Sequence, residues 1–384
     1  MSYTTQKLKD ISVIRTGKLD SNAAVGNGIY PFFTCDPQTL RINTWAYDTE
    51  AVLLAGNNAS GNYTAKYYRG KFNAYQRTYI IETADSEVLS VRFLCYAINQ
   101  QLRLLKTMSS GSTTKFLTIR MLHNLDIPCP DIEVQNRIVN VLGNIDDLIE
   151  NNQKQIKLLE EAAQRLYKEW FVDLRFPGYE TTPIADGVPA GWEKGRADSF
   201  FDIAIGKTPP RAEKQWFTSG DKGIPWLSIS DMGNTGVFAF ATSEGLTEEA
   251  VKKHNMKVVP TGTIFVSFKL TVGRVAIANT PMCTNEAIAH FYIKDSLLQA
   301  YTYSYLRNFE YDTLGNTSSI SKAVNSKIIK AMPFVMPTDD IIAGFSLLVA
   351  PIINEIQCRQ AACLKLQEAR DRLLPKLMSG EIEV

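Results

Sequence analysis

The chain carries, at residues 130–173, the stretch PDIEVQNRIVNVLGNIDDLIENNQKQIKLLEEAAQRLYKEWFVD, and at residues 337–380 it carries PTDDIIAGFSLLVAPIINEIQCRQAACLKLQEARDRLLPKLMSG. The two stretches align without a gap at an offset of 207 residues, the difference between 337 and 130. Apolar residues recur in both at alternating steps of four and three, which is the 3.5-residue period of a coiled-coil seam. Each stretch therefore predicts a long helix with one apolar stripe.

Asn152 and its repeat equivalent, Arg359, interrupt the apolar seam, and Arg370 breaks its phase again. Asn152 and Arg359 either fix the register of a helix pair or contact a partner subunit. Because neither helix can bury its stripe alone, the two are expected to pair antiparallel within one chain. Pro351 is expected to kink the second helix or to mark its effective start. The predicted seam residues are Ile138, Leu142, Ile145, Ile149, Asn152, Ile156, Leu159, Leu166 and Trp170 in the first helix, and Val349, Ile352, Ile356, Arg359, Leu366, Leu373 and Leu377 in the second.

Composition is that of an ordinary soluble globular protein. With 384 residues, 45% hydrophobic and 21% charged, the chain is long enough for two cores and is not of a disordered type. No apolar run approaches the roughly 20 residues that span a bilayer. The first residues, MSYTTQKLKD, lack the apolar core of a signal peptide. We therefore expect a cytoplasmic protein without a membrane partner.

Cysteine and histidine are too few and too scattered to predict a metal centre. The six cysteines form no CxxC pair, and only three histidines occur, at positions 123, 254 and 290. No metal site is expected, and the cysteines, at 35, 95, 129, 283, 358 and 363, are expected to be buried, reduced thiols.

The net charge of +1 divides unevenly along the chain. Residues 1–130 hold 14 Lys/Arg and 9 Asp/Glu, and residues 193–337 hold 16 and 13, so both blocks are basic. The first helical stretch, 131–175, holds 6 and 9, and the second, 338–384, holds 5 and 7, so both are acidic. This pattern favours blocks that meet phosphates and helices that meet protein, although a chance distribution explains the charges equally well.

The two blocks also resemble one another at an offset of 189. Gly17 and Lys18 fall on Gly206 and Lys207, and the apolar positions before them match as well. Short apolar runs bounded by Gly, Asn and Pro predict compact α+β blocks. The predicted organisation is a first block at 1–130, a helix at 131–175, a connector at 176–192, a second block at 193–337 and a second helix at 338–384.

No catalytic motif is recognised. Gly206-Lys207-Thr208 resembles the end of a phosphate-binding loop, but the glycine required five positions earlier is Phe201. Thr208-Pro209-Pro210 lacks the Asn or Asp that begins the corresponding methyltransferase motif, and HExxH and GxSxG are missing. We therefore predict no catalytic residues, and no enzyme.

Four short motifs follow one another along the chain: Leu166–Asp173 (LYKEWFVD), Arg175–Gly178 (RFPG), Val188–Trp192 (VPAGW) and Leu373–Ile382 (LLPKLMSGEI). In this order they resemble the specificity subunit of type I restriction–modification systems, and the resemblance covers essentially the whole chain. The chain departs from the family pattern at Ile342, where the second helix entry should have Gln.

The resemblance implies an α+β fold with two target recognition domains in a pseudo-twofold repeat, separated by two long antiparallel coiled-coil helices. Each domain would read one half of a bipartite double-stranded DNA site. Two methyltransferase subunits would bind the helices, two motor-nuclease restriction subunits would join them for phage defence, and S-adenosylmethionine would be bound by the methyltransferases, with no cofactor in this chain. A helix of about 40 residues is about 60 Å long, ample to separate two readers by one turn of duplex, ~34 Å.

Candidate DNA contacts lie in amide-rich and basic loops, because Asn and Gln can read adenine, Arg and Lys can read guanine, and Ser, Thr and Lys can hold phosphates. Ordinary polar turns remain the alternative for each. In the first block they are Lys18, Asn57, Asn58, Asn62, Tyr63, Lys66, Arg69, Gln76, Arg77, Ser112, Thr113 and Lys115, and in the second Lys207, Lys269, Thr271, Arg274, Asn285, Ser318, Ser319 and Lys322.

Two other functions remain open at this point. A coiled-coil scaffold without a nucleic-acid role predicts no salt-dependent DNA binding. A methyltransferase without a recognisable motif predicts S-adenosylmethionine binding by the isolated chain. The DNA sequence recognised cannot be deduced, because side-chain identity fixes base choice only together with geometry.

Overall fold

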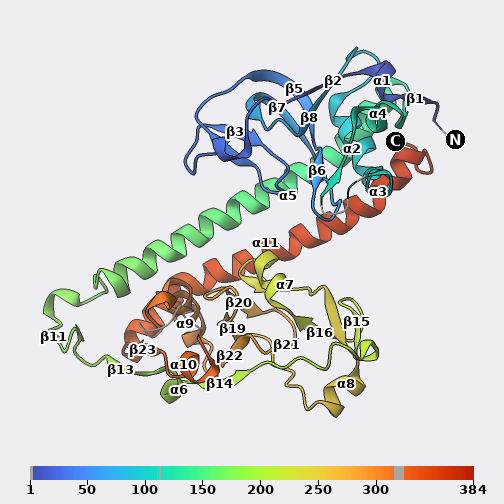
Figure 1. Ribbon diagram of the computed structural model, residues 1–384. Helices are drawn as coiled ribbons and strands as arrows, with labels where there is room; N and C mark the ends of the chain where they lie inside the picture. The colour runs from blue at the N-terminus through green and yellow to red at the C-terminus, as the bar shows by residue number, and fades with distance from the viewer. Residues whose placement is uncertain (1–2, 110, 112–113, 315–323) are drawn as a thin grey trace. The chain divides into compact units, whose positions relative to one another are not determined.

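The computed structural model describes residues 3–109, 111, 114–314 and 324–384. The chain divides into two compact units. Unit 1 comprises Met1–Ile149 with Lys365–Val384, and unit 2 comprises Glu150–Leu364. Both divisions fall inside long helices, α5 at Ile132–Tyr167 and α11 at Asp339–Ser379, so each helix contributes one segment to each unit (Figure 1).

The two long helices pair antiparallel within each unit. In unit 1, Leu142 of α5 shares a buried cluster with Leu377 of α11, and farther along α5, Asp146 accepts a hydrogen bond from Arg370 at 3.0 Å. In unit 2, Asn152 of α5 meets Arg359 of α11, and the rings of Trp170 and Phe345 lie 5.8 Å apart. In both units, residues with higher numbers in α5 contact residues with lower numbers in α11. The helices therefore run antiparallel, which confirms the predicted pairing. All of the predicted seam residues are buried or half-buried.

Helix α11 is the more apolar of the two. It is long and apolar enough to cross a membrane, with a mean hydropathy of 1.7 over its most apolar window. Its apolar face is a core face, because Phe345, Val349, Ile353 and Ile356 are all buried in the main cluster of unit 2. Pro351 is exposed inside α11. The helix begins at Asp339, so the alternative that Pro351 marks its start is wrong.

Unit 1 is built around a curled six-stranded sheet with the order β2-β8-β5-β7-β3-β4. Its neighbours are antiparallel except β3 and β7, which are parallel. Helix α2 packs on this sheet and supplies Phe93 and Leu94, both fully buried, to the core. The elements are β1 Thr5–Lys7, α1 Leu8–Ile11, β2 Ser12–Thr16, β3 Tyr30–Phe33, β4 Leu40–Ile42, β5 Tyr47–Ala55, β6 Asn57–Asn58, β7 Ala65–Ala74, β8 Thr78–Thr83, α2 Val91–Gln100, α3 Leu102–Met108, β9 Lys115–Phe116, α4 Ile119–His123 and β10 Asp126–Pro128.

Unit 2 contains a five-stranded sheet with the order β14-β22-β19-β20-β17 and a smaller sheet, β15-β18-β16-β21. The larger sheet is antiparallel except for its last pair, β20 and β17. Its elements are β13 Glu193–Arg196, α6 Ala197–Phe200, β14 Asp202–Ile205, β15 Phe217–Ser219, β16 Ile224–Leu227, α7 Ile229–Asn234, β17 Phe238–Ala239, β18 Glu244–Leu246, α8 Glu248–Lys253, β19 Ile264–Ser267, β20 Val275–Ala278, β21 Cys283–Thr284, β22 Ile288–Tyr292, α9 Leu297–Asn308, α10 Ser326–Lys330 and β23 Pro333–Met336.

The two sheets are copies of one topology. Strands β2, β8, β5, β7 and β3 correspond in order and direction to β14, β22, β19, β20 and β17. The match extends to single hydrogen bonds. The Leu8 amide donates to the Leu125 carbonyl at 2.9 Å, and the Ala197 amide, 189 residues later, donates to the Met332 carbonyl at 2.9 Å. The predicted block repeat is therefore a repeat of fold.

Two local features qualify the sequence expectations. The connector contains a short hairpin, β11 Ile184–Ala185 with β12 Val188–Pro189, and the rings of Phe176 and Trp192 at its two ends lie 5.1 Å apart.

All six cysteines are free. The expectation that all are buried is wrong, because Cys358 is exposed on α11 and Cys35 is half-buried.

Candidate nucleic-acid interface

In unit 1, several of the candidate residues gather at one end of the six-stranded sheet. We call this end edge 1. It comprises the residues after β2, the β5–β7 loop, the β7–β8 turn and β9. The Lys18 amide donates to the Ala74 carbonyl at 3.2 Å, and the Gly56 amide donates to the Arg77 carbonyl at 2.8 Å. Residues Asn57–Asn58 pair with Lys115–Phe116. Edge 1 therefore brings together Lys18, Asn57, Asn58, Gln76, Arg77 and Lys115.

Gly17 fixes this edge by close approach of backbone. A Cβ atom at Gly17 would lie 2.1 Å from the Ala74 carbonyl oxygen. Only a residue without a side chain fits there, and Lys18 directly follows with its side chain exposed. The ammonium is thus carried by a backbone that is locked onto the sheet.

The same construction recurs in unit 2 at edge 2, which comprises the residues after β14, the β19–β20 hairpin and the turn before β22. The Gly206 amide donates to the Ile288 carbonyl at 3.1 Å, as the Gly17 amide donates to the Thr78 carbonyl at 3.1 Å. A Cβ atom at Gly206 would lie 2.1 Å from the Asn285 carbonyl oxygen. Lys207 follows, exposed, with its amide 3.0 Å from the Thr284 carbonyl oxygen.

The hairpin of edge 2 lies beside the turn that precedes β22. The Phe268 amide donates to the Ala287 carbonyl at 2.9 Å, so Lys269 and Thr271 lie on the same edge as Asn285. Glu286, which follows Asn285 in this candidate region, accepts a short hydrogen bond from the Thr208 hydroxyl. Edge 2 therefore holds cations, an amide and one carboxylate.

Several candidate side chains are engaged within the fold. The Asn58 Oδ1 atom accepts from the Ser60 amide at 2.9 Å and the Asn62 amide at 3.1 Å, which closes the β5–β7 loop. The Asn62 Oδ1 atom accepts from the Lys106 ammonium at 2.7 Å. The Lys66 ammonium donates to the Asp36 carbonyl at 3.2 Å, and burial lowers the Lys66 pKa despite the opposing charge of Asp36. These side chains bond to other parts of unit 1, so they stabilise the loops of edge 1.

Three further candidates have distinct placements. Tyr63 is 5% exposed in the unit 1 core. Arg69 is exposed on β7 opposite Glu50, outside the loops of edge 1. The Gln76 Nε2 atom donates to the Asp20 carboxylate at 2.7 Å. The candidates Ser112, Thr113, Ser318, Ser319 and Lys322 lie outside the described residues.

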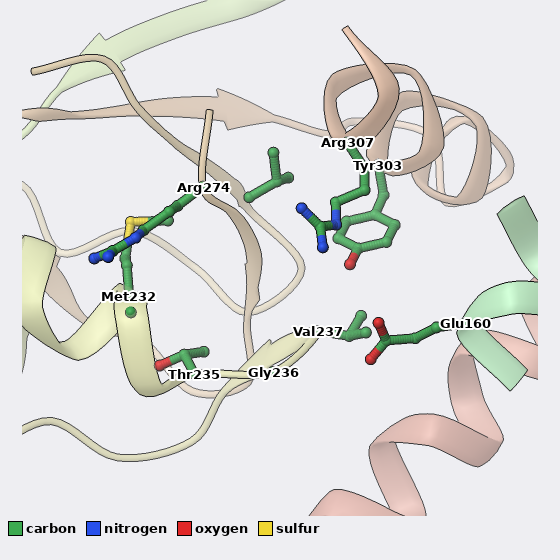
Figure 2. A pocket seen from close by; sticks show the side chains of 10 residues that line it. Glu160, Met232, Thr235, Gly236, Val237, Arg274, Tyr303 and Arg307 are labelled. Carbon is green, nitrogen blue, oxygen red and sulfur yellow. The ribbon is translucent and has the colours of Figure 1, made fainter. Parts of the chain in front are cut away.

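Arg274 is directed into unit 2 rather than along edge 2. Its Nη1 atom donates to the Ile229 carbonyl at 2.6 Å, and it lies so close to Gly233 that a Cβ atom there would be 2.7 Å away. It lines a cavity of about 250 Å³ together with Glu160, Tyr303 and Arg307, as Figure 2 shows. Burial raises the Glu160 pKa, and the charge of Arg307 partly offsets this. Through this hydrogen bond Arg274 ties the β19–β20 hairpin to α7, and this structural role explains its position.

Sequence reasoning missed Leu270, at the tip of that hairpin, which is 91% exposed and has a positive φ of 64°. The signal was an apolar residue in the segment KLTVG between two buried strands. Within the described residues, no group of three or more His, Cys, Asp or Glu side chains is placed to hold a metal ion.

The fold therefore defines a protein with two α+β domains of one topology, each with an exposed lysine held at one end of its sheet. The chain belongs to the family described as the type I restriction modification DNA specificity domain, whose model matches residues 2–161 and 189–344. These two matches cover most of the chain, one for each globular block.

Curated relatives agree with this family, and a solved structure shares the fold. The chain is 30% identical to the type I restriction enzyme EcoDI specificity subunit of Escherichia coli, over 53% of this chain and 50% of that protein. It is 30% identical to the MjaIX specificity subunit of Methanocaldococcus jannaschii, over 73% and 66%. The chain thus spans about half to two thirds of the length of these relatives. The fold is similar to that of a type I restriction-modification S subunit from M. genitalium, with a TM-score of 0.62, 14% identity, and coverage of 98% and 96%.

Proposed function

We propose that this chain is the non-catalytic specificity subunit of a type I restriction–modification complex. Edge 1 reads one half of a bipartite DNA site and edge 2 reads the other. The paired helices set the spacing between the halves. S-adenosylmethionine is held by methyltransferase subunits, two restriction subunits join for cleavage, and the complex acts on DNA in the cytoplasm.

The observation that carries this proposal is the duplicated edge. Gly17–Lys18 and Gly206–Lys207 have the same backbone hydrogen bonds on sheets of the same order. A backbone locked against a sheet with an exposed lysine suits a phosphate contact, which positions a protein on DNA. Side chains beside it, Asn57 in edge 1 and Lys269 in edge 2, are of the types that read adenine and guanine.

Each long helix exposes apolar residues to a partner, and one pair of them, Val141 and Leu348, is equivalent in the repeat. Val141 of α5 is 37% exposed, and Leu348, its equivalent at offset 207, is 46% exposed. Leu148, two helical turns from Val141, is 50% exposed, and Leu347 beside Leu348 is 77% exposed. Exposed apolar residues gathered on a helix mark protein contact sites. We assign one methyltransferase subunit to each of these surfaces.

The test is DNA binding as a function of salt, for the chain in complex with its methyltransferase subunits. Each lysine that contacts a phosphate contributes about one unit to the slope of log K against log salt. The double variant K18A/K207A is expected to lower the slope by about two while the protein remains folded. An unchanged slope would refute the phosphate contacts, and no DNA binding at all would favour the scaffold function.

A further inference from the structure

Leu270 is placed where a fold on its own would not place it. At 91% it is more exposed than the other large apolar side chains in the described part of the chain that reach the surface. Its φ of 64° lies in the left-handed region, which favours Gly, Asn or Asp. A polar or glycine residue would relieve both the exposure and the backbone strain. A leucine here is explained by a partner outside the chain.

The hairpin that carries Leu270 is held firmly at its base. The Ser267 hydroxyl donates to the Thr271 carbonyl at 2.6 Å and accepts from the Arg274 amide at 3.0 Å. Ser267 is fully buried, and Arg274 is anchored on α7 (Figure 2). A Cβ atom at Gly273 would lie 2.7 Å from the Tyr311 ring. The backbone of the hairpin is therefore held at its base, so binding through its tip costs less conformational entropy than binding through a free loop would.

The surroundings of Leu270 select a nucleic acid as that partner. Lys269 directly precedes Leu270 in the chain, and Lys207, whose ammonium donates to the Asn255 carbonyl at 3.2 Å, belongs to the same edge. Glu286, on the turn beside the hairpin, would be repelled by phosphates, but a carboxylate can accept a hydrogen bond from the cytosine amino group. Lysines can contact the phosphates of the DNA backbone, whereas a carboxylate and a leucine can contact base edges. Together these residue types suit a surface that enters a groove of the duplex.

The equivalent loop of unit 1 has a different chemistry. Between β5 and β7 the residues are Gly56 to Thr64, and Gly61 has a positive φ of 71°. Its side chains are amides and hydroxyls, closed by Asn58. The unit 2 hairpin has two residues of positive φ, Leu270 and Gly273 with φ of 87°, whereas the described unit 1 loop has Gly61. Of these two loops, only the one in unit 2 places a leucine in the left-handed region.

We infer that Leu270 is a specificity residue of edge 2 that contacts the apolar surface of the bases in the second half-site. This inference rests on the proposed function. The apolar surface is either a thymine methyl group in the major groove or an opened base step into which the side chain inserts. In both cases the contact is to bases and not to phosphates.

The test uses the full chain in its methyltransferase complex, with duplexes that carry the mapped bipartite site. Leu270→Asn keeps a residue that tolerates the left-handed backbone, and Leu270→Ala removes the side chain with less change in polarity. Leu297→Ala is the control, because Leu297 is 46% exposed on α9 of the same unit. Both Leu270 variants are expected to bind the site about tenfold or more weakly. Affinity for unrelated DNA, the salt slope and the first half-site preference should not change, and Leu297→Ala should bind as the parent does.

Two further measurements distinguish contact with a thymine methyl group from insertion into an opened base step. Deoxyuridine in place of thymine in the second half-site removes the methyl group, and it reproduces the loss if the methyl is the contact. 2-Aminopurine in that half-site brightens on binding the parent but not the variants if a step is opened. Unchanged cognate affinity for both Leu270 variants overturns the inference. If the complex also binds DNA with a salt slope that responds to K18A/K207A, the proposed function still stands. If the complex does not bind DNA, both fail.

Discussion

The Nη1 atom of Arg359 donates a hydrogen bond of 3.0 Å to the Oδ1 atom of Asn152, and these two residues are 207 positions apart. They are therefore equivalent positions of the helical repeat that contact one another. In an antiparallel pair of repeated helices, a residue meets its own equivalent only where the local twofold axis passes. Of the two roles expected for these residues, the contact supports the register of the helix pair.

We expect Arg359→Ala to lower the free energy of unfolding by about 1 kcal/mol, because Asn152 loses a charged donor. Replacing both residues by Leu should raise thermal stability by extending the apolar stripe, but should loosen the register. Thermal unfolding of the single and double variants, with a cysteine crosslink across the pair to report register, measures both effects. A Leu/Leu variant that keeps a single register would contradict the assigned role.

Acid should destabilise unit 2 through His290. This side chain is fully buried on β22 with its Nε2 atom 2.6 Å from the Thr284 hydroxyl, and burial, aided by Lys257, lowers its pKa to about 4. The folded state holds the neutral form. The contribution of neutral His290 to the free energy of unfolding is complete above about pH 6.5 and is lost as the pH falls toward 4. At about 1.4 kcal/mol per pH unit the loss is about 3 kcal/mol.

Chemical unfolding of unit 2 between pH 7 and pH 4, followed by the fluorescence of its tryptophans, measures this loss. His290→Gln keeps a hydrogen-bonding partner for Thr284 and should flatten the pH dependence in this window. Equal pH dependence in the parent and the variant would show that other groups control acid stability.

Replacing the edge glycines should damage one half-site at a time. A Cβ atom at Gly206 would collide with the Asn285 carbonyl oxygen, and one at Gly17 with that of Ala74. We expect Gly206→Ala to abolish recognition of the second half-site and Gly17→Ala that of the first. Gly26→Ala is the matched control, because no atom lies within 4 Å of its Cβ position. Methylation of plasmids with one altered half-site gives the measurement, and tolerance of both edge substitutions would contradict the geometry.

The helices are expected to set the spacer between the half-sites. Inserting one heptad in both α5 and α11 lengthens each by about 10 Å while keeping the seam in phase. Since DNA rises 3.4 Å per base pair, the preferred spacer should grow by up to about three base pairs, with weaker binding because the duplex must absorb a twist of about 100°. Mapping of methylated sites checks this, and an unchanged spacer at full activity refutes it.

The helix repeat was predictable because its signal is local: a 3.5-residue period can be read without knowing any distant contact. The correspondence of Gly17 with Gly206 was predictable from the block offset. The position of Arg274 was not, because its acceptor, Ile229, is 45 residues away. The exposure of Leu270 was not predictable either, since burial of an apolar residue depends on where the hairpin projects. Pro351 gave two alternatives that sequence alone could not separate.

Each unit is proposed to read its own half of a bipartite site. Methylation-site mapping in cells that express this chain with its methyltransferase subunits tests it most directly, with Asn57→Ala and Lys269→Ala as variants in equivalent loops. We predict a two-part motif with a fixed spacer, relaxed only in its first part by Asn57→Ala and only in its second part by Lys269→Ala. A single continuous motif, or equal loss of both parts by either folded variant, would contradict the account.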